Sequence, residues 1–158
     1  LERLNSVTQI VQGAGMKPGT AFRDWRSEMA NSLIAQRLGI AIGDPVSVIE
    51  RVRTADGIPF CYDINFIPAK YITQQDEDSI GESLLRYLSE RYGQIRQALA
   101  YLYPYTADAI VSEKLGVPVG HLLMLLEHTH YTPDGSPMWY SRTFHRSDVI
   151  SFHIVRSL

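Results

Sequence analysis

Hydrophobic and polar side chains alternate between Val46 and Pro68, on both sides of a short Ala-Asp-Gly segment. Two runs of β-forming residues around such a turn predict a β-hairpin. Successive side chains of a strand point to opposite faces. The first strand should therefore have one face with three valines and a glutamate and one face that carries two arginines. The first face holds Val46, Val48, Glu50 and Val52, and the second holds Ser47, Ile49, Arg51 and Arg53.

The rest of the chain shows further helical and extended patterns. Ser6 and Gln9 have the spacing of a capping box and begin a short helix, and residues 76–93 carry an apolar stripe that predicts the clearest helix. Two more helices are predicted over residues 31–38 and 107–115, the second capped by Thr106. The other predicted strands are 20–29, 94–106, 121–131, 138–146 and 152–156.

The sequence contains an internal repeat with an offset of 77 residues. Residues 35–43 match residues 112–120, and after a one-residue insertion Tyr62 matches Tyr140. Each copy reads as a helix followed by a hairpin, and two copies are too few for a solenoid. We therefore expect a single domain over residues 1–158 with an α+β fold, in which helices pack on a mostly antiparallel sheet built from two pseudo-symmetric helix-hairpin halves. A cleft between related hairpins is a natural place for a small ligand.

Composition narrows the class of protein. The 158 residues are 45% hydrophobic and 20% charged, which is typical of a folded domain that buries a core. The formal net charge is −2 and no run of Lys or Arg is present, so the sequence lacks the basic footprint of a nucleic-acid-binding surface.

The single cysteine and the hydropathy pattern indicate the compartment. Cys61 alone can form neither an internal disulfide nor a thiolate metal cluster, and it favours a reducing, cytoplasmic setting. No signal peptide is recognisable, and no apolar run approaches the roughly 20 residues that span a membrane. The chain begins at Leu1 without Met, and we expect it to be part of a longer protein.

The arginine pair is the first candidate for chemistry. A strand rises roughly 3.3 Å per residue, so Arg51 and Arg53 should stand about 7 Å apart on one face. Two guanidiniums at this spacing can share one anion, because each presents a planar fork of donors that matches phosphate or carboxylate. Alternatively, the two arginines are solvated edge charges or ion-pair partners of Asp63 and Glu50.

Other chemistry finds little support in the sequence. His128 and His130 fall on one strand face, but no third residue stands at a persuasive spacing for a metal site, and we expect no metal and no cofactor. We find no nucleophile with a neighbouring base, no glycine-rich phosphate loop and no paired acid-base carboxylates.

Several short motifs in a fixed order resemble the UTRA domain, the effector-binding half of HutC-type GntR transcription regulators. The resemblance covers essentially all 158 residues. It rests on the repeat, Thr8, Gly15-Met16, the Arg51 and Arg53 pair, the Asp-Gly-x-Pro turn, the helix that follows Ser83, Tyr140-Ser141 and the segment from Arg146 to Asp148.

The resemblance implies a fold, partners and a binding site. It implies a chorismate-lyase-like fold, a homodimer and an N-terminal winged helix-turn-helix before Leu1, so that DNA contact is made outside this fragment. In sugar-phosphate-responsive relatives an anion is held at positions that read Thr8, Arg51, Arg53 and Ser83 here. An acidic residue on the next strand holds the polar end of the ligand, and Asp63, on a strand face with Cys61 and Asn65, matches it.

On the second hairpin the sequence departs from that pattern. Trp139 stands where the amino-sugar responders carry an acidic residue, and His145 stands where they carry a tyrosine. An indole offers an apolar face and one N–H donor in place of a carboxylate acceptor. The two residues therefore favour an anionic ligand with a flatter or less hydroxylated body.

Three functions fit these observations. The leading hypothesis is a sensor domain that binds a small anionic metabolite, phosphorylated or carboxylated, and modulates operator binding. The alternative is an enzyme resembling chorismate lyase that acts on an anionic aromatic acid, since such a lyase works largely by confinement and arginine contacts. A third is a dimerisation module without a ligand.

Overall fold

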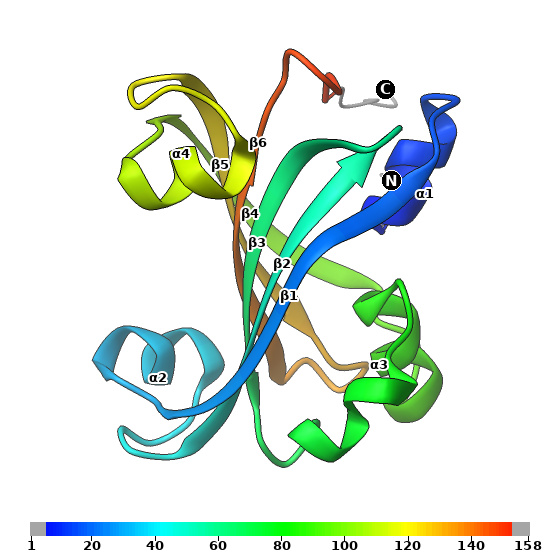
Figure 1. The fold of residues 1–158 in the computed structure, drawn as a ribbon. Coiled ribbons are helices and arrows are strands. Elements are labelled where there is room, and N and C mark those ends of the chain that lie inside the picture. The colour runs from blue at the N-terminus through cyan, green and yellow to red at the C-terminus, as the bar shows by residue number, and fades with distance from the viewer. Residues whose placement is uncertain (1–5, 153–158) are drawn as a thin grey trace, which may run out of the picture.

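Residues 6–152 are described by a computed structural model, and a six-stranded sheet forms their centre. The strands are β1 Pro18–Met29, β2 Pro45–Ala55, β3 Ile58–Pro68, β4 Gln97–Thr106, β5 Leu122–Tyr131 and β6 Pro137–His145. They follow the spatial order β1-β2-β3-β6-β5-β4, and each is antiparallel to its neighbours (Figure 1). The predicted α+β class with a mostly antiparallel sheet is confirmed.

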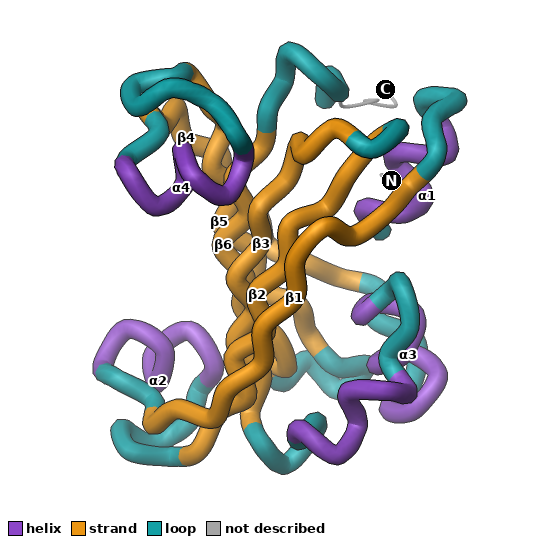
Figure 2. The backbone as a smooth tube through the Cα atoms, viewed as in Figure 1, coloured by secondary structure: helices purple, strands orange, loops and turns teal. Residues whose placement is uncertain are grey.

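Helices cover both faces of the sheet. Residues 6–152 contain α1 Val7–Gly13, α2 Ser32–Leu38, α3 Leu84–Tyr92 and α4 Ala109–Leu115, with a 3-10 helix η1, Gln74–Ser79, before α3. Figure 2 shows the twisted strands between two pairs of helices, α2 and α4 on one side and α1 and α3 on the other. Among residues 6–152, no helix combines the length and the apolar character needed to cross a membrane.

The alternation along β2 decides which helices its side chains meet. Val48 packs in one cluster with Leu38 of α2, and Val52 packs in another with the buried face of α4. Ile49 points the opposite way and packs with Leu88 of α3. The two faces predicted for this strand are therefore correct, and the arginine face is the one that α1 and α3 cover.

Each half of the chain sends a helix across to the other half. α2 contacts β6 and α4 contacts β3, and these two strands are the neighbours that join the halves at the middle of the sheet. The order of elements along each half, a helix followed by a hairpin, is the one that the repeat predicts.

The helix predicted over residues 76–93 is wrong as a single element. The structure has η1 and α3 in its place, separated by residues 80–83, which include Gly81 and Ser83. Gly81 adopts φ +63°, a left-handed conformation that a continuing helix does not contain, and Ser83 is extended and caps α3 with its side chain. The apolar stripe is real, but a loop interrupts it.

Other element boundaries in the structure differ from the predicted ones for local reasons. Asp108, not Thr106, caps α4, because its Oδ1 accepts from the N–H of Val111 at 2.9 Å, while Thr106 ends β4. Phe152 lies outside any strand, so the strand predicted over 152–156 does not begin there, and residues 153–156 lie outside the described residues. The Ser6–Gln9 capping box is present as predicted.

Gly39 and Gly116 end α2 and α4 and give the first test. Both adopt the left-handed region, at φ 60° and φ 65°. A side chain there costs about 1–2 kcal/mol, so Gly39→Ala and Gly116→Ala should each lower the free energy of unfolding by a similar amount, measured by chemical denaturation. Gly13→Ala, a helical position with open space around it, is the control and should gain up to about 1 kcal/mol. A neutral result at both caps would contradict this interpretation.

Candidate functional site

A buried polar strip runs across the face of the sheet beneath α1 and α3. The register places Arg53 opposite Cys61, Arg51 opposite Asp63 and Asp63 opposite Thr143. Side chains directly opposite one another share a face, so β2, β3 and β6 all contribute. The charged and polar members of the strip are 1–5% exposed: Arg51, Arg53, Asp63, Asn65, Ser141, Thr143 and His145.

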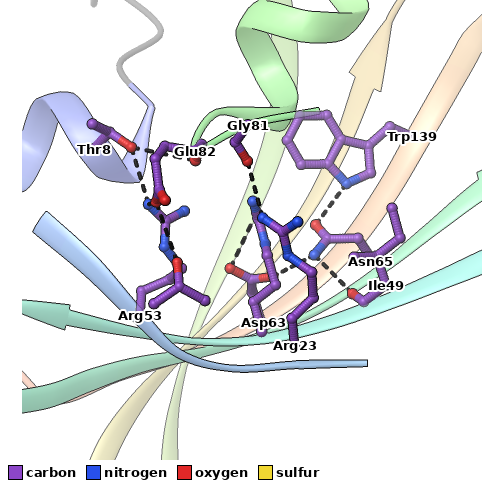
Figure 3. A network of polar contacts seen from close by, with 11 residues as sticks. Thr8, Arg23, Ile49, Arg53, Asp63, Asn65, Gly81, Glu82 and Trp139 are labelled. Carbon is purple, nitrogen blue, oxygen red and sulfur yellow. Dashed lines mark hydrogen bonds and ion pairs between the residues drawn. The ribbon is translucent and has the colours of Figure 1, made fainter. Parts of the chain in front are cut away.

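Arg51 has a fixed internal partner. Its Nε lies 3.1 Å from Asp63 Oδ1 and its Nη2 lies 3.3 Å from Asp63 Oδ2, with both side chains almost fully buried. Asn65 donates to the same carboxylate and to the backbone oxygen of Ile49 at 3.0 Å, and it accepts from Trp139 Nε1 at 2.8 Å (Figure 3). Of the alternatives left open for this arginine, pairing with Asp63 is thus confirmed, and a solvated edge charge is wrong, because Arg51 is buried. The same network fixes the indole of Trp139.

Arg53 is buried as deeply as Arg51, but fewer of its guanidinium nitrogens have a hydrogen-bond partner. It is 2% exposed, and its Nη2 donates to Thr8 Oγ1 at 3.0 Å and lies 3.5 Å from Glu82 Oε2. Its Nε has no hydrogen-bond partner among the described residues. Burial, reinforced by the charge of nearby Arg51, lowers the pKa of Arg53 from its ordinary value. This guanidinium therefore has spare donors in an environment that favours a negatively charged partner.

The loop before α3 closes over Arg53. Thr8 Oγ1 donates to the backbone oxygen of Glu82 at 3.4 Å, and Arg23 Nη2 donates to the backbone oxygen of Gly81 at 3.0 Å (Figure 3). Ser83 caps α3, its Oγ accepting from a backbone N–H at 3.2 Å. α1, β1, β2 and the positive N-terminal end of α3 therefore meet at one point.

A narrow cleft lies beside this point, between the sheet and α3. Its walls include two arginines and four apolar side chains, and it does not have room for a water molecule. A ligand can enter it only if side chains or the loop move. The residues that line it are Arg23, Trp25, Ile49, Arg51, Ile80 and Leu84.

Histidines occupy the far end of the strip. His145 lies opposite Cys61, two strands away from the arginines, and packs against the ring of Phe152 with centroids 4.3 Å apart. Its Nδ1 and that of His130 have no hydrogen-bond partner in the described part of the chain. The ring of His130 stacks on Trp139 at 3.9 Å. His145 therefore shares the face of the arginines, but among the described residues no hydrogen bond joins it to the Arg53 network.

The described residues contain no group of three His, Cys, Asp or Glu side chains that could hold a metal ion.

The UTRA domain family matches residues 13–151. The chain belongs to this family.

Curated relatives of this UTRA domain are transcriptional repressors by name. It is 27% identical over 154 residues to the HTH-type transcriptional repressor NagR of Bacillus subtilis strain 168. It is 24% identical over 153 residues to the HTH-type transcriptional repressor PhnF of Mycolicibacterium smegmatis. Each alignment covers 96% of this chain and 63% of the relative, so the chain spans less than two thirds of the length of these proteins.

Solved structures share the fold. The crystal structure of PhnF from Mycobacterium smegmatis has a TM-score of 0.90 at 23% identity, over 98% of this chain and 69% of that chain. The ligand-binding domain of a putative GntR-family regulator from Bordetella bronchiseptica has a TM-score of 0.77 at 22% identity, over 90% of each chain.

Sequence reasoning about this UTRA domain missed two residues of the candidate site, Arg23 and Glu82. Arg23 lies opposite Arg51, but only the pairing of β1 with β2 reveals this neighbour. Glu82 falls inside the helix predicted over 76–93, where its carboxylate would belong to a helix surface. The signal available in the sequence was Gly81 before a capping serine, which is typical of a loop entering a helix.

The buried histidines predict how stability depends on pH. Burial, with a smaller contribution from His128, lowers the pKa of His130 and of His145 to about 3. The ordinary value is about 6.5, so as pH falls the unfolded chain takes up protons before the folded UTRA domain does. We expect each histidine to lower the free energy of unfolding by up to about 1.4 kcal/mol per pH unit from about pH 6.5 to 4.5.

Denaturation at several pH values measures this slope in wild type and in the variants His130→Gln and His145→Gln. Each variant should flatten the slope, whatever its stability at neutral pH. Hydrogen bonds from backbone N–H groups lower the pKa values of Asp76 and Asp108 from the ordinary range of aspartate, so these groups titrate below this window. Slopes equal to wild type in both variants would contradict the assignment.

Proposed function

We propose that this UTRA domain binds a small anionic effector on its arginine face and passes the binding signal to a DNA-binding domain. The observation that carries the proposal is Arg53, a guanidinium that is 2% exposed and has an unused Nε donor where α1, β1, β2 and the loop before α3 meet. A buried charge without a full set of partners is unfavourable, and an anion from solution would supply them.

The anion would lie at what we call the anion seat, bounded by Arg53, Thr8 and Ser83. Arg53 supplies charge and donors, Thr8 supplies a hydroxyl, and the N-terminal end of α3 supplies backbone N–H groups and a favourable dipole. Arg51 adds to the positive potential at the seat. Its two hydrogen bonds to Asp63 hold the guanidinium in place and limit how far it can turn toward a ligand.

The body of the effector would extend from the anion seat into the cleft beside α3. Trp25, Ile49 and Leu84 give this cleft an apolar lining. Asn65 already satisfies the N–H of Trp139, so the indole has mainly its ring to offer, which favours a flat or sparsely hydroxylated body. His145, with its unused Nδ1, would contact only a ligand long enough to reach the far end of the strip.

The DNA-binding domain would be a winged helix-turn-helix in a part of the protein that precedes this chain. The curated relatives are HTH-type repressors of which this chain spans 63%, which supports the proposal. A domain with this role works in the cytoplasm. The enzyme alternative is not retained, because the relatives are named as repressors and not as lyases.

The two edges of the sheet differ in a way that supports a homodimer. β1 carries Arg23, Asp24, Arg26 and Glu28 and has a bulge near its start, features that protect an edge from pairing. β4 carries no charged residue, and four of its large apolar side chains are 44–48% exposed: Leu99, Tyr101, Leu102 and Tyr103. We propose that β4 pairs with β4 of a second copy.

Arg53→Ala tests the anion seat. A thermal-shift screen of sugar phosphates, sugar acids, phosphonates and aromatic acids should find compounds that raise the Tm of the wild-type domain. Removing a buried charged hydrogen-bond donor typically costs about 2–5 kcal/mol of binding, so Arg53→Ala should abolish these shifts. Arg86→Ala, at an exposed arginine of α3, is the matched control and should keep them. Shifts retained in Arg53→Ala would refute the site.

Leu102→Arg tests the dimer. A charge at the centre of the proposed β4 pairing occurs twice in a symmetric interface, and we expect the dimer dissociation constant to rise at least about 30-fold, measured by sedimentation. Ile42→Arg is the control, since Ile42 is 71% exposed and belongs to the loop between α2 and β2. Unchanged dimerisation in Leu102→Arg, or a monomeric wild type, would exclude this interface.

A further inference from the structure

The carboxylate of Glu82 occupies the anion seat. Its Oε2 lies 3.5 Å from Arg53 Nη2 and accepts a hydrogen bond from Thr20 Oγ1 at 3.3 Å. Its backbone oxygen accepts from Thr8 Oγ1 at 3.4 Å, and the preceding Gly81 is held by Arg23 (Figure 3). A negatively charged group of this chain therefore already stands where an anionic ligand would bind.

The two arginines differ in how firmly their counter-charges are held. Asp63, the partner of Arg51, has a side chain that is 3% exposed, and the carboxylate is held by a second donor, Asn65. Glu82, the partner of Arg53, has a side chain that is 61% exposed. A carboxylate that remains mostly in water loses little hydration when it leaves, so the partner of Arg53 can be exchanged whereas the partner of Arg51 cannot.

We propose that Glu82 is a built-in competitor of the effector: its carboxylate neutralises Arg53 until the anion of the effector displaces it. This rests on the proposed anion seat and adds a regulatory residue to it. The loop geometry allows the exchange, because Gly81 has a left-handed conformation with open space around its Cα, and Glu82 needs only to swing outward into solvent.

Competition by a tethered group sets a threshold for binding. A side chain held beside its partner acts at an effective concentration of the order of millimolar, which a free anion has to overcome. A monocarboxylate would exchange one negative charge for another of the same size. An anion with two charges and more acceptor oxygens would gain Coulomb energy at Arg53 and Arg51, so the competitor selects for it.

Displacement of Glu82 would also change the contacts of α1. The contacts from Thr8 and Thr20 tie the loop before α3 to the first helix and the first strand. When the carboxylate leaves, the contact from Thr20 to it is lost, and the contact from Thr8 to the loop backbone has to adjust. The exchange of anions at Arg53 would thereby alter how α1 packs on the loop before α3.

Inorganic phosphate is the probe for the test, at constant ionic strength, with binding measured by calorimetry and by the phosphate dependence of Tm. The variants are Glu82→Gln, Glu82→Ala, Arg53→Ala and Glu90→Gln. Glu90 is an exposed glutamate of α3 paired with Arg86, so Glu90→Gln removes the same charge away from the seat. If Glu82 covers Arg53 about nine-tenths of the time, phosphate should bind about tenfold more tightly to both Glu82 variants.

A second expectation separates competition from a structural role. Without phosphate, Glu82→Gln should have a lower Tm than wild type, because Arg53 loses its counter-charge, and saturating phosphate should remove that difference. Glu90→Gln should match wild type in both measurements, and Arg53→Ala should not bind phosphate.

The outcomes distinguish failure of this inference from failure of the proposed function. If Arg53→Ala loses phosphate binding but the Glu82 variants bind within twofold of wild type, or more weakly, the seat stands and the competitor role is refuted. If the wild type and the Glu82 variants all fail to bind phosphate, or if Arg53→Ala binds as they do, the anion seat itself is wrong and the inference falls with it.

Discussion

The structure depends on keeping two guanidiniums on a face of the sheet from which water is excluded. A buried charge is tolerated only with a counter-charge and a full set of hydrogen bonds, and this requirement shapes everything around the arginines. Arg51 meets it through Asp63, which is in turn held by Asn65. Arg53 meets it only in part, through a hydroxyl and an exposed carboxylate. The first arginine therefore has a buried internal partner, and the second is the one that our proposal assigns to ligand binding.

This division follows from the two-residue period of a single hairpin. One face of β2 and β3 packs aliphatic and aromatic side chains under α2 and α4, as the cluster of Val52, Tyr62 and Leu115 shows. The other face carries polar groups under α1 and α3. The same strands thus supply core on one side and the buried polar strip on the other, so the residues of the candidate site rest on elements that the core holds in place.

The sequence predicted the elements that depend on local periodicity and missed those that depend on register and loops. Arg51 and Arg53 could be placed on one face because alternation within a strand is local. Arg23 could not be placed beside them, because the pairing of β1 with β2 is a long-range choice. Glu82 was assigned to a helix because the apolar stripe continues through the loop that Gly81 opens. Pairing of Arg51 with Asp63 was one of the alternatives left open from the sequence, and the structure has that pair.

The cleft beside α3 is closed to water, and this has a kinetic consequence for any small molecule that enters it. Entry has to wait for a spontaneous opening of the wall, so capture cannot proceed at the rate of encounter in solution. At high concentration the observed rate of uptake would level off at the frequency of opening. Escape is subject to the same gate, so a molecule held in the cleft would also have to wait for the wall to open before it could leave.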